Sequence, residues 1–248
     1  MKSLHISVAP EVIGHLGPLN MTNSLLTGVI VMLFLIFVAW KTKAGNTSKK
    51  KSTLYLLMDM AIEKAYMFFK NIAGERTDVI FPLLMTFFLF IIFGNWIGLL
   101  PGVGSIGFYE ITEHEKLLIP YLRGPNADLN TTFALALISV SVTQYLSVKT
   151  LGFKVYVSKF INIKNPIKFF VGILELISEF AKILSFSFRL FGNIFAGEVL
   201  LAVMIFLVPI LVPVPFLILE VFVGFIQALV FTMLTTIFIV IATESSHE

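Results

Sequence analysis

The chain has 248 residues, of which 57% are hydrophobic and only 13% are charged, with 18 Lys and Arg against 15 Asp and Glu. Because a soluble domain carries about 25% charged residues, this composition excludes an ordinary water-soluble protein and indicates an integral membrane protein. The absence of cysteine excludes a disulfide framework, and four scattered histidines give no metal site, so we expect neither metal nor cofactor.

Five apolar runs follow one another along the chain, and helices of about 20 residues cross the roughly 30 Å hydrocarbon core. They cover residues 25–40, 79–100, 131–148, 167–208 and 214–242, between an outside tail (1–24) and an inside tail (243–248). Since only helices or closed barrels satisfy the backbone in lipid, and no run alternates with period two, we expect one all-α membrane domain.

Two segments depart from a simple span. Residues 54–72 place apolar side chains at helical spacing opposite charged ones, which predicts an amphipathic helix at the membrane interface. The fourth run is about 40 residues long, so it must tilt steeply, extend beyond the bilayer or lie partly along another surface. The prolines Pro209, Pro213 and Pro215 predict a turn that returns the fifth helix antiparallel to the fourth.

Lysines in the loops predict the orientation, because positive charges collect on the inner side. The cationic clusters follow the first and third spans and comprise Lys41, Lys43, Lys49, Lys50 and Lys51, then Lys149, Lys154, Lys159, Lys164 and Lys168. The N-terminal tail and residues 101–130 lack such a cluster. We therefore expect the N-terminus outside and the C-terminus inside.

Residues 102–107 spell GxGxxG, a pattern that binds dinucleotides when it joins a strand to a helix. Here the pattern follows an apolar run and Pro101, and no acidic residue about 20 positions later completes the unit. We interpret it as a turn of the outside loop, where glycine adopts conformations closed to other residues.

Ionisable side chains are concentrated in the last two spans, where each is expensive to place in lipid. At about 100° per residue, one stripe of the fourth span contains Glu175, Ser178, Glu179, Lys182, Ser185, Arg189 and Asn193. Glu198 lies on the opposite face, roughly 13 Å further toward the outside. In the fifth span Glu220, Gly224 and Gln227 share a face.

These acids approach Arg189 from both sides, and the arginine interrupts any continuous path between them. A guanidinium neither accepts nor relays a proton near neutral pH. Passage therefore needs a mobile carrier, such as a carboxyl group on a partner that is neutral in lipid and ionised beside Arg189.

Several short motifs support this interpretation. Residues 187–193 read Ser-Phe-Arg-Leu-Phe-Gly-Asn and residues 196–198 read Ala-Gly-Glu. Residues 125–130 read Pro-Asn-Ala-Asp-Leu-Asn, Leu174 precedes Glu175, and Ala-Leu-Val-Phe at 228–231 follows Glu220 and Gln227. With the five spans and the interfacial helix, the chain resembles subunit a of F-type ATP synthases over nearly its whole length.

The resemblance implies that Arg189 is the stator arginine, which pairs with the ionised carboxylate of each c subunit and blocks proton leak between two half-channels. The implied outer half-channel contains Glu198, Glu220, Gln227 and, near its mouth, Asp128. The implied inner half-channel contains Glu175, Ser178 and Asn193. The long fourth and fifth helices would then wrap the curved c-ring.

The resemblance also implies the setting. The partners are the c-ring, subunit b with the peripheral stalk, the F1 sector and membrane lipids, with no nucleic acid and no nucleotide site in this non-catalytic chain. We expect a bacterial inner membrane, with an organellar inner or thylakoid membrane as the alternative. Asn23 stands where some relatives have aspartate. Glu198 and Glu220 are both acidic where many relatives have one histidine, and we hypothesise that they share a proton.

Each residue also has a structural interpretation. On this interpretation, Arg189 would form an ion pair with Glu175 or Glu179, and Glu198 and Glu220 would only pack helices together. Glu179 would neutralise Lys182, three residues away. Gln227 and Asn193 would form hydrogen bonds to neighbouring helices, and Asp128 would cap a helix. At the level of function, the alternatives are a self-contained secondary transporter or proton channel, whose usual internal repeat is missing, and an assembly scaffold.

Overall fold

The computed structural model describes residues 7–17, 19–46, 53–100, 102–104, 106–111, 116–160, 166–208 and 211–244. Its helices are α1 (Asn23–Asn46), α2 (Thr53–Ala73), α3 (Thr77–Gly98), α4 (Leu129–Leu151), α5 (Phe153–Phe160), α6 (Pro166–Leu207) and α7 (Pro213–Thr243). The 3₁₀ turns are η1 (Gly74–Arg76) and η2 (Pro125–Ala127). Five helical segments are long and apolar enough to cross a membrane, which confirms the predicted class.

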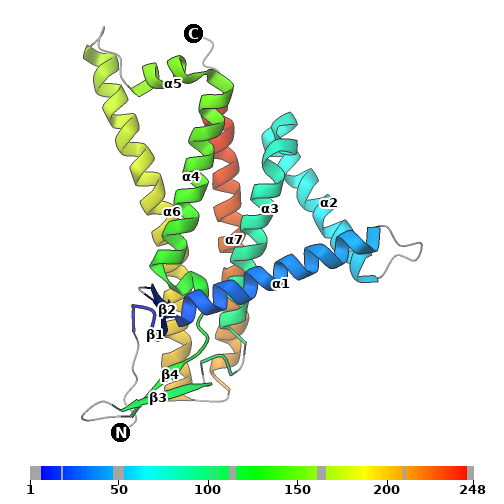
Figure 1. Cartoon of the computed structure of the whole chain (residues 1–248), viewed down its shortest axis with the longest axis vertical. Coiled ribbons are helices and arrows are strands. Elements are labelled where there is room, and N and C mark those ends of the chain that lie inside the picture. Colours follow the sequence, from blue (N-terminus) through cyan, green and yellow to red (C-terminus); the bar gives the residue numbers. More distant parts are fainter. Residues whose placement is uncertain are drawn as a thin grey trace.

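The last two helices are long and antiparallel, as predicted. At 42 residues α6 is about 63 Å long, and at 31 residues α7 is about 46 Å long. Figure 1 shows them running in opposite directions beside α4, while α1 crosses the group at a wide angle. Both exceed the roughly 30 Å hydrocarbon core, so each must either tilt in the membrane or extend beyond it.

The main core forms where α3, α4, α6 and α7 meet. Its buried side chains are Phe87, Ile91, Ile92, Leu135, Ala136, Phe186, Leu190, Ala228 and Phe231. The ring of Phe231 contacts Phe87 and Phe186, with centroids 5.4 and 5.0 Å away. Aromatic contacts of this kind fix the relative positions of helices beyond what burial alone provides. This core holds α6 with one face inward and the opposite face exposed.

The segment predicted to be an interfacial helix forms α2. It buries Phe69 and Ala73 against Ile80 and Leu84 of α3 and Ile239 of α7. Other apolar residues of α2, including Leu56, Leu57 and Met67, are exposed. The apolar face of α2 is therefore shared between the protein and its surroundings.

Local chemistry explains several helix ends. Gly74 and Gly152 have φ values of 59° and 84°, and they separate α2 from α3 and α4 from α5. Such left-handed conformations favour glycine. Pro213 occupies the first turn of α7, where its missing N–H costs nothing. Three predicted features lie outside the described residues: Pro209, the lysines at 49–51 and 164, and the tail from residue 245.

The structure differs from the all-helical expectation in two loops. Strands β1 (Val12–Leu16) and β2 (Leu19–Thr22) pair antiparallel, as do β3 (Gly107–Ile111) and β4 (Lys116–Pro120). Both hairpins lie at the end of the molecule that carries the N-terminus (Figure 1). These strands are too short to give a clear alternating pattern. The glycine motif fits a turn at Gly102, whose φ is 99°, whereas Gly107 begins β3.

Candidate functional site

Arg189 lies on the face of α6 turned away from the core, and its side chain is exposed. Its Nη2 donates a hydrogen bond to Ser185 Oγ, at 3.2 Å. Its backbone carbonyl oxygen accepts one from Asn193 Nδ2, at 3.0 Å. Among the described residues, no carboxylate pairs with this guanidinium. A structural ion pair therefore does not explain Arg189, and Asn193 bonds its own helix rather than a neighbour.

An open groove of about 230 Å³ surrounds Arg189 between α6 and α7. From α6 it is lined by Ser178, Ala181, Lys182, Ser185, Phe186 and Arg189, and from α7 by Leu234 and Phe238. The predicted polar stripe thus forms one wall of the groove. Leu234 and Phe238 supply an apolar opposite wall, so the polar groups of the groove all come from α6: the guanidinium of Arg189, the ammonium of Lys182, which is paired with Glu179, and the hydroxyls of Ser178 and Ser185.

Glu175 and Glu179, which precede Arg189 on α6, are both paired with lysines. Glu175 Oε1 lies 2.6 Å from Nζ of Lys159 in α5, and Glu179 Oε1 lies 2.6 Å from Nζ of Lys182. The proposed pairing three residues apart is therefore present. The other Glu179 oxygen accepts from Gln144 Nε2, at 2.6 Å. Only Ser178, among the predicted inner residues, opens directly into the groove with Arg189.

Tyr156 extends this inner network from α5, outside the spans. Its hydroxyl donates to Gln144 Oε1 at 3.0 Å. Burial, followed by the negative charges of Glu179 and Glu175, raises the pKa of Tyr156 above its ordinary value. The hydroxyl therefore stays protonated at neutral pH and acts as a hydrogen-bond donor.

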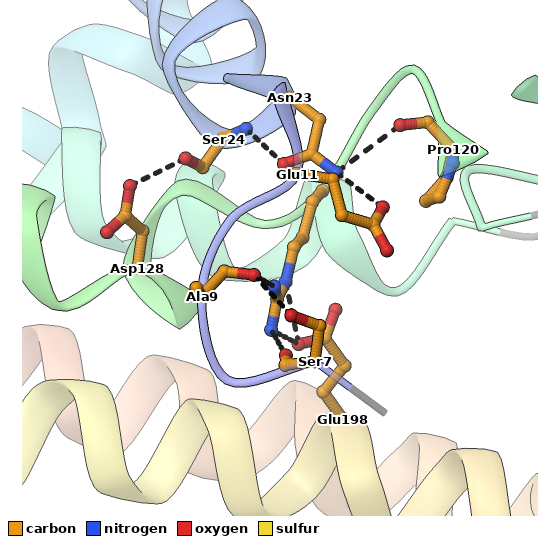
Figure 2. Close-up of polar contacts among 9 residues, drawn as sticks. Ser7, Ala9, Glu11, Asn23, Ser24, Pro120, Asp128 and Glu198 are labelled. Carbon is orange, nitrogen blue, oxygen red and sulfur yellow. Dashed lines mark hydrogen bonds and ion pairs between the residues drawn. The ribbon is translucent and has the colours of Figure 1, made fainter. Parts of the chain in front are cut away.

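Further along α6 than Arg189, Glu198 pairs with Arg123, which comes from the loop before α4. Glu198 Oε2 accepts from Arg123 Nε at 3.2 Å and from Nη2 at 3.0 Å. The remaining donors of Arg123 reach the backbone carbonyl groups of Ser7 and Ala9. Figure 2 shows Glu198 on α6 beside Ser7 and Ala9, close to the loop that carries Asp128. Glu198 is thus engaged with an arginine rather than with Glu220.

Asp128 performs the capping role that the sequence left open. Its Oδ1 accepts from the backbone N–H of Asn130 at 2.9 Å, which caps α4. Its Oδ2 accepts from Ser24 Oγ at 2.6 Å (Figure 2). Nearby, Asn23 is fully buried and its Nδ2 donates to Glu11 Oε2 at 3.2 Å. Asp128 and Asn23 therefore tie the N-terminus of α1 to the loop before α4.

Glu220 occupies a different environment. Its side chain is only 7% exposed and lies directly over Gly197 of α6, where a Cβ would approach the carboxyl carbon to 2.1 Å. Within the described part of the chain, the carboxyl group has no hydrogen bond or ion pair. It forms no bond with Glu198, so the two carboxyl groups do not share a proton directly. Gln227, half-buried on α7, likewise has no bonded neighbour among these residues.

Sequence reasoning missed a buried amide cluster beside Glu220. Asn95 Nδ2 donates to the carbonyl oxygen of Gly224 at 2.9 Å, and its Oδ1 accepts from Asn126 Nδ2 at 2.7 Å. Trp96 Nε1 donates to the carbonyl oxygen of Val221 at 3.1 Å. In the sequence, the only hint of this cluster is that Asn95 and Asn126 lie near the ends of predicted spans. Their contact depends on the fold. In the described chain, no three acidic or imidazole groups gather as metal ligands.

The chain is similar to known proteins over nearly its whole length. Residues 21–240 match the family model described as ATP synthase A chain. The chain is 36% identical to ATP synthase subunit a of Gloeobacter violaceus, over 98% of this chain and 93% of the relative. It is 33% identical to ATP synthase subunit a of Desulforamulus reducens (94% and 81%) and 30% identical to that of Legionella pneumophila (90% and 87%).

Proposed function

The chain belongs to the ATP synthase A chain family, and from this premise we propose that it is the stator of the Fo motor and conducts protons past a ring of c subunits. Two offset half-channels lead from opposite sides of the membrane to the surface that carries Arg189. A proton enters on one side, neutralises a c-subunit carboxylate, travels through lipid as the ring turns, and leaves on the other side.

The observation that carries this proposal is the unpaired guanidinium of Arg189. An arginine costs about 3 kcal/mol or more at the bilayer centre, yet Arg189 is exposed, and among the described residues its guanidinium bonds only the hydroxyl of Ser185. A counter-charge from a partner resolves this cost. A c-subunit carboxylate supplies it, because it is ionised beside Arg189 and neutral when it faces lipid.

The two sides of Arg189 are assigned different roles. Glu220, Glu198 and Gln227 form the outer half-channel with Asp128 near its mouth, and buried Glu220 is positioned to take up a proton because no cation among the described residues pairs with it. Glu175, Ser178 and Asn193 form the inner half-channel. Glu175 is paired with Lys159, which makes Ser178 the polar group nearest to the groove on this side.

The proposal extends to the setting of the chain. The partners are the c-ring, subunit b with the peripheral stalk, and through them the F1 sector. The membrane is a bacterial inner membrane, with the N-terminus outside and the C-terminus inside, as the lysine distribution favours. The chain itself performs no bond-making chemistry; it couples ion flow to rotation.

The test is ATP-driven proton pumping in inverted vesicles that carry Arg189→Ala. We expect pumping to be lost while the c-ring and peripheral stalk still co-purify with the chain. The matched control is Arg76→Ala, because Arg76 is also an arginine, but among the described residues its side chain bonds backbone carbonyl groups of α7 and does not face the groove. Coupled pumping retained in Arg189→Ala would refute the stator role, and a chain that purifies without rotary partners would favour a self-contained transporter.

A further inference from the structure

Arg123 is an unusual residue of the outer half-channel, because it is a buried arginine in a loop. Its side chain is 8% exposed. It makes four hydrogen bonds: two to Glu198 Oε2 and one each to the carbonyl oxygens of Ala9, at 3.1 Å, and Ser7, at 3.0 Å. Its guanidinium carbon also lies 5.9 Å from the ring centroid of Phe195. These contacts fix the side chain from several directions.

The backbone of Arg123 is held as firmly as its side chain. Its N–H donates to Thr27 Oγ1 at 3.1 Å, and that hydroxyl donates in turn to the carbonyl oxygen of Asn23 at 2.9 Å. Residues 123–128 are all buried. The guanidinium therefore projects toward α6 from a buried, hydrogen-bonded backbone. We take its position as fixed, and the position of the Glu198 carboxylate as set by it.

The charge balance then constrains Glu198. The Arg123 side chain is 8% exposed and the Glu198 side chain is 42% exposed. The buried guanidinium requires a counter-charge, and removing that counter-charge leaves it unpaired. The other nearby acids have different contacts. Glu11 accepts a hydrogen bond from Asn23, Asp128 accepts one from Ser24, and the carboxyl group of Glu220 lies against Gly197. Glu198 is thus the carboxylate that balances Arg123. Protonating Glu198 would leave that charge uncompensated.

We propose that Arg123 is a positioning residue, which holds Glu198 as a fixed anion toward the N-terminal segment and leaves Glu220 as the outer carboxyl group that gains and loses the proton. This inference rests on the proposed function and deepens it. It separates two acids that sequence alone presents as equivalent. It also makes residues 7–9 part of the outer half-channel, because their carbonyl groups take the remaining guanidinium donors.

The experiment measures passive proton conduction in vesicles stripped of F1, with subunit c and subunit b quantified in each membrane. Four variants are compared with the wild type: Arg123→Gln, Glu198→Gln, the double variant Arg123→Gln/Glu198→Gln, and Glu220→Gln. Each single change at the pair leaves one charge unbalanced, so we expect conduction per complex to fall by roughly tenfold, equivalent to about 1.4 kcal/mol. Glu220→Gln is expected to abolish conduction.

The double variant decides the question. Two neutral amide groups restore charge balance, so we expect it to conduct better than either single variant, which a purely structural loss at Arg123 would not produce. A double variant as inactive as Glu198→Gln would overturn the proposal, because Glu198 itself would then have to carry the proton. If Arg123→Gln does not assemble, Arg123→Lys replaces it: conduction near the wild-type level supports the fixed-charge role, and conduction at the Glu198→Gln level refutes it.

Two controls keep this inference distinct from the proposed function. Arg76→Gln removes an arginine that makes two hydrogen bonds to backbone carbonyl groups and, among the described residues, no ion pair, and it should leave conduction per assembled complex unchanged. Absence of conduction in wild-type vesicles with an intact c-ring would contradict the proposed function. Normal conduction in the wild type together with normal conduction in assembled Arg123→Gln would contradict only the role of Arg123.

Discussion

Replacing Gly197 with alanine tests whether the position of the Glu220 carboxyl group governs proton transfer. A Cβ at position 197 would lie 2.1 Å from Cδ and Oε2 of Glu220 and 2.3 Å from Oε1. Ordinary van der Waals contact begins at 3.4 Å. The carboxyl group would therefore have to retreat by about 1.3 Å, since its attraction to neighbouring atoms turns to repulsion at closer range.

The expected effect on function is much larger than the effect on stability. The displaced atoms are the end of a flexible side chain, so the strain is about 0.5–1.5 kcal/mol, and alanine returns up to about 1 kcal/mol as a better helix former than glycine. A reacting group misplaced by about 1 Å lowers a rate roughly 100-fold. We therefore expect Gly197→Ala to assemble normally and to pump protons about 100-fold more slowly.

The assay is ATP-driven acidification of inverted vesicles, normalised to the subunit c that co-purifies. Gly28→Ala is the matched control, because Gly28 is also a helical glycine in a span, and its Cβ would meet Pro125 Cβ at 3.6 Å, an ordinary contact. Wild-type pumping by assembled Gly197→Ala would refute the reasoning. Loss of assembly would show instead that Gly197 serves helix packing.

Three further predictions concern other parts of the molecule. Arg76→Gln removes two hydrogen bonds to carbonyl groups in the last turn of α7 and should lower the unfolding free energy in detergent by roughly 2 kcal/mol, measured by thermal unfolding; an unchanged Tm would contradict this. Asp128→Ala should cost about 1 kcal/mol through the lost cap of α4, whereas Asp128→Asn should retain the cap and the stability. The folded-state pKa of Tyr156 is raised, so the fold favours its protonated form. The stability that this supplies is present below the unfolded pKa of about 10. It is lost as pH rises through the folded pKa. Alkaline titration of tyrosinate absorbance should accordingly lose a component that titrates above the ordinary tyrosine range in Tyr156→Phe, and equal curves would exclude the shift.

Helical geometry predicted much of the candidate site, because residues on one helix have fixed relative directions. The stripe from Ser178 to Arg189 is present as one groove wall. The pairing of Glu179 with Lys182 follows from their spacing of three residues. The capping role of Asp128 was one of two open interpretations, and the hydrogen bond to Asn130 shows the cap.

Interactions across long distances in the chain were not predictable in this way. Arg123 and Glu198 are 75 positions apart, and Asn95 reaches Gly224 across 129. The angle between two residues on different helices depends on how those helices pack, which no local pattern encodes. The expectation that Glu198 and Glu220 share a proton assumed that nearby positions on adjacent helices face each other. In the structure, the Glu220 carboxyl group instead lies against Gly197, and Glu198 is paired with Arg123.

The sequence by itself determined the membrane class, the five spans, the tilt or overhang implied by a 42-residue helix and the presence of an arginine that needs a counter-charge. These follow from hydrophobicity, length and the cost of burying charge, which are properties of each segment alone. Only the tertiary structure decided which acids are neutralised and which remain unpaired. That outcome depends on side chains from separate segments meeting at hydrogen-bond distance, and a shift of a single helix by a few ångströms would change it.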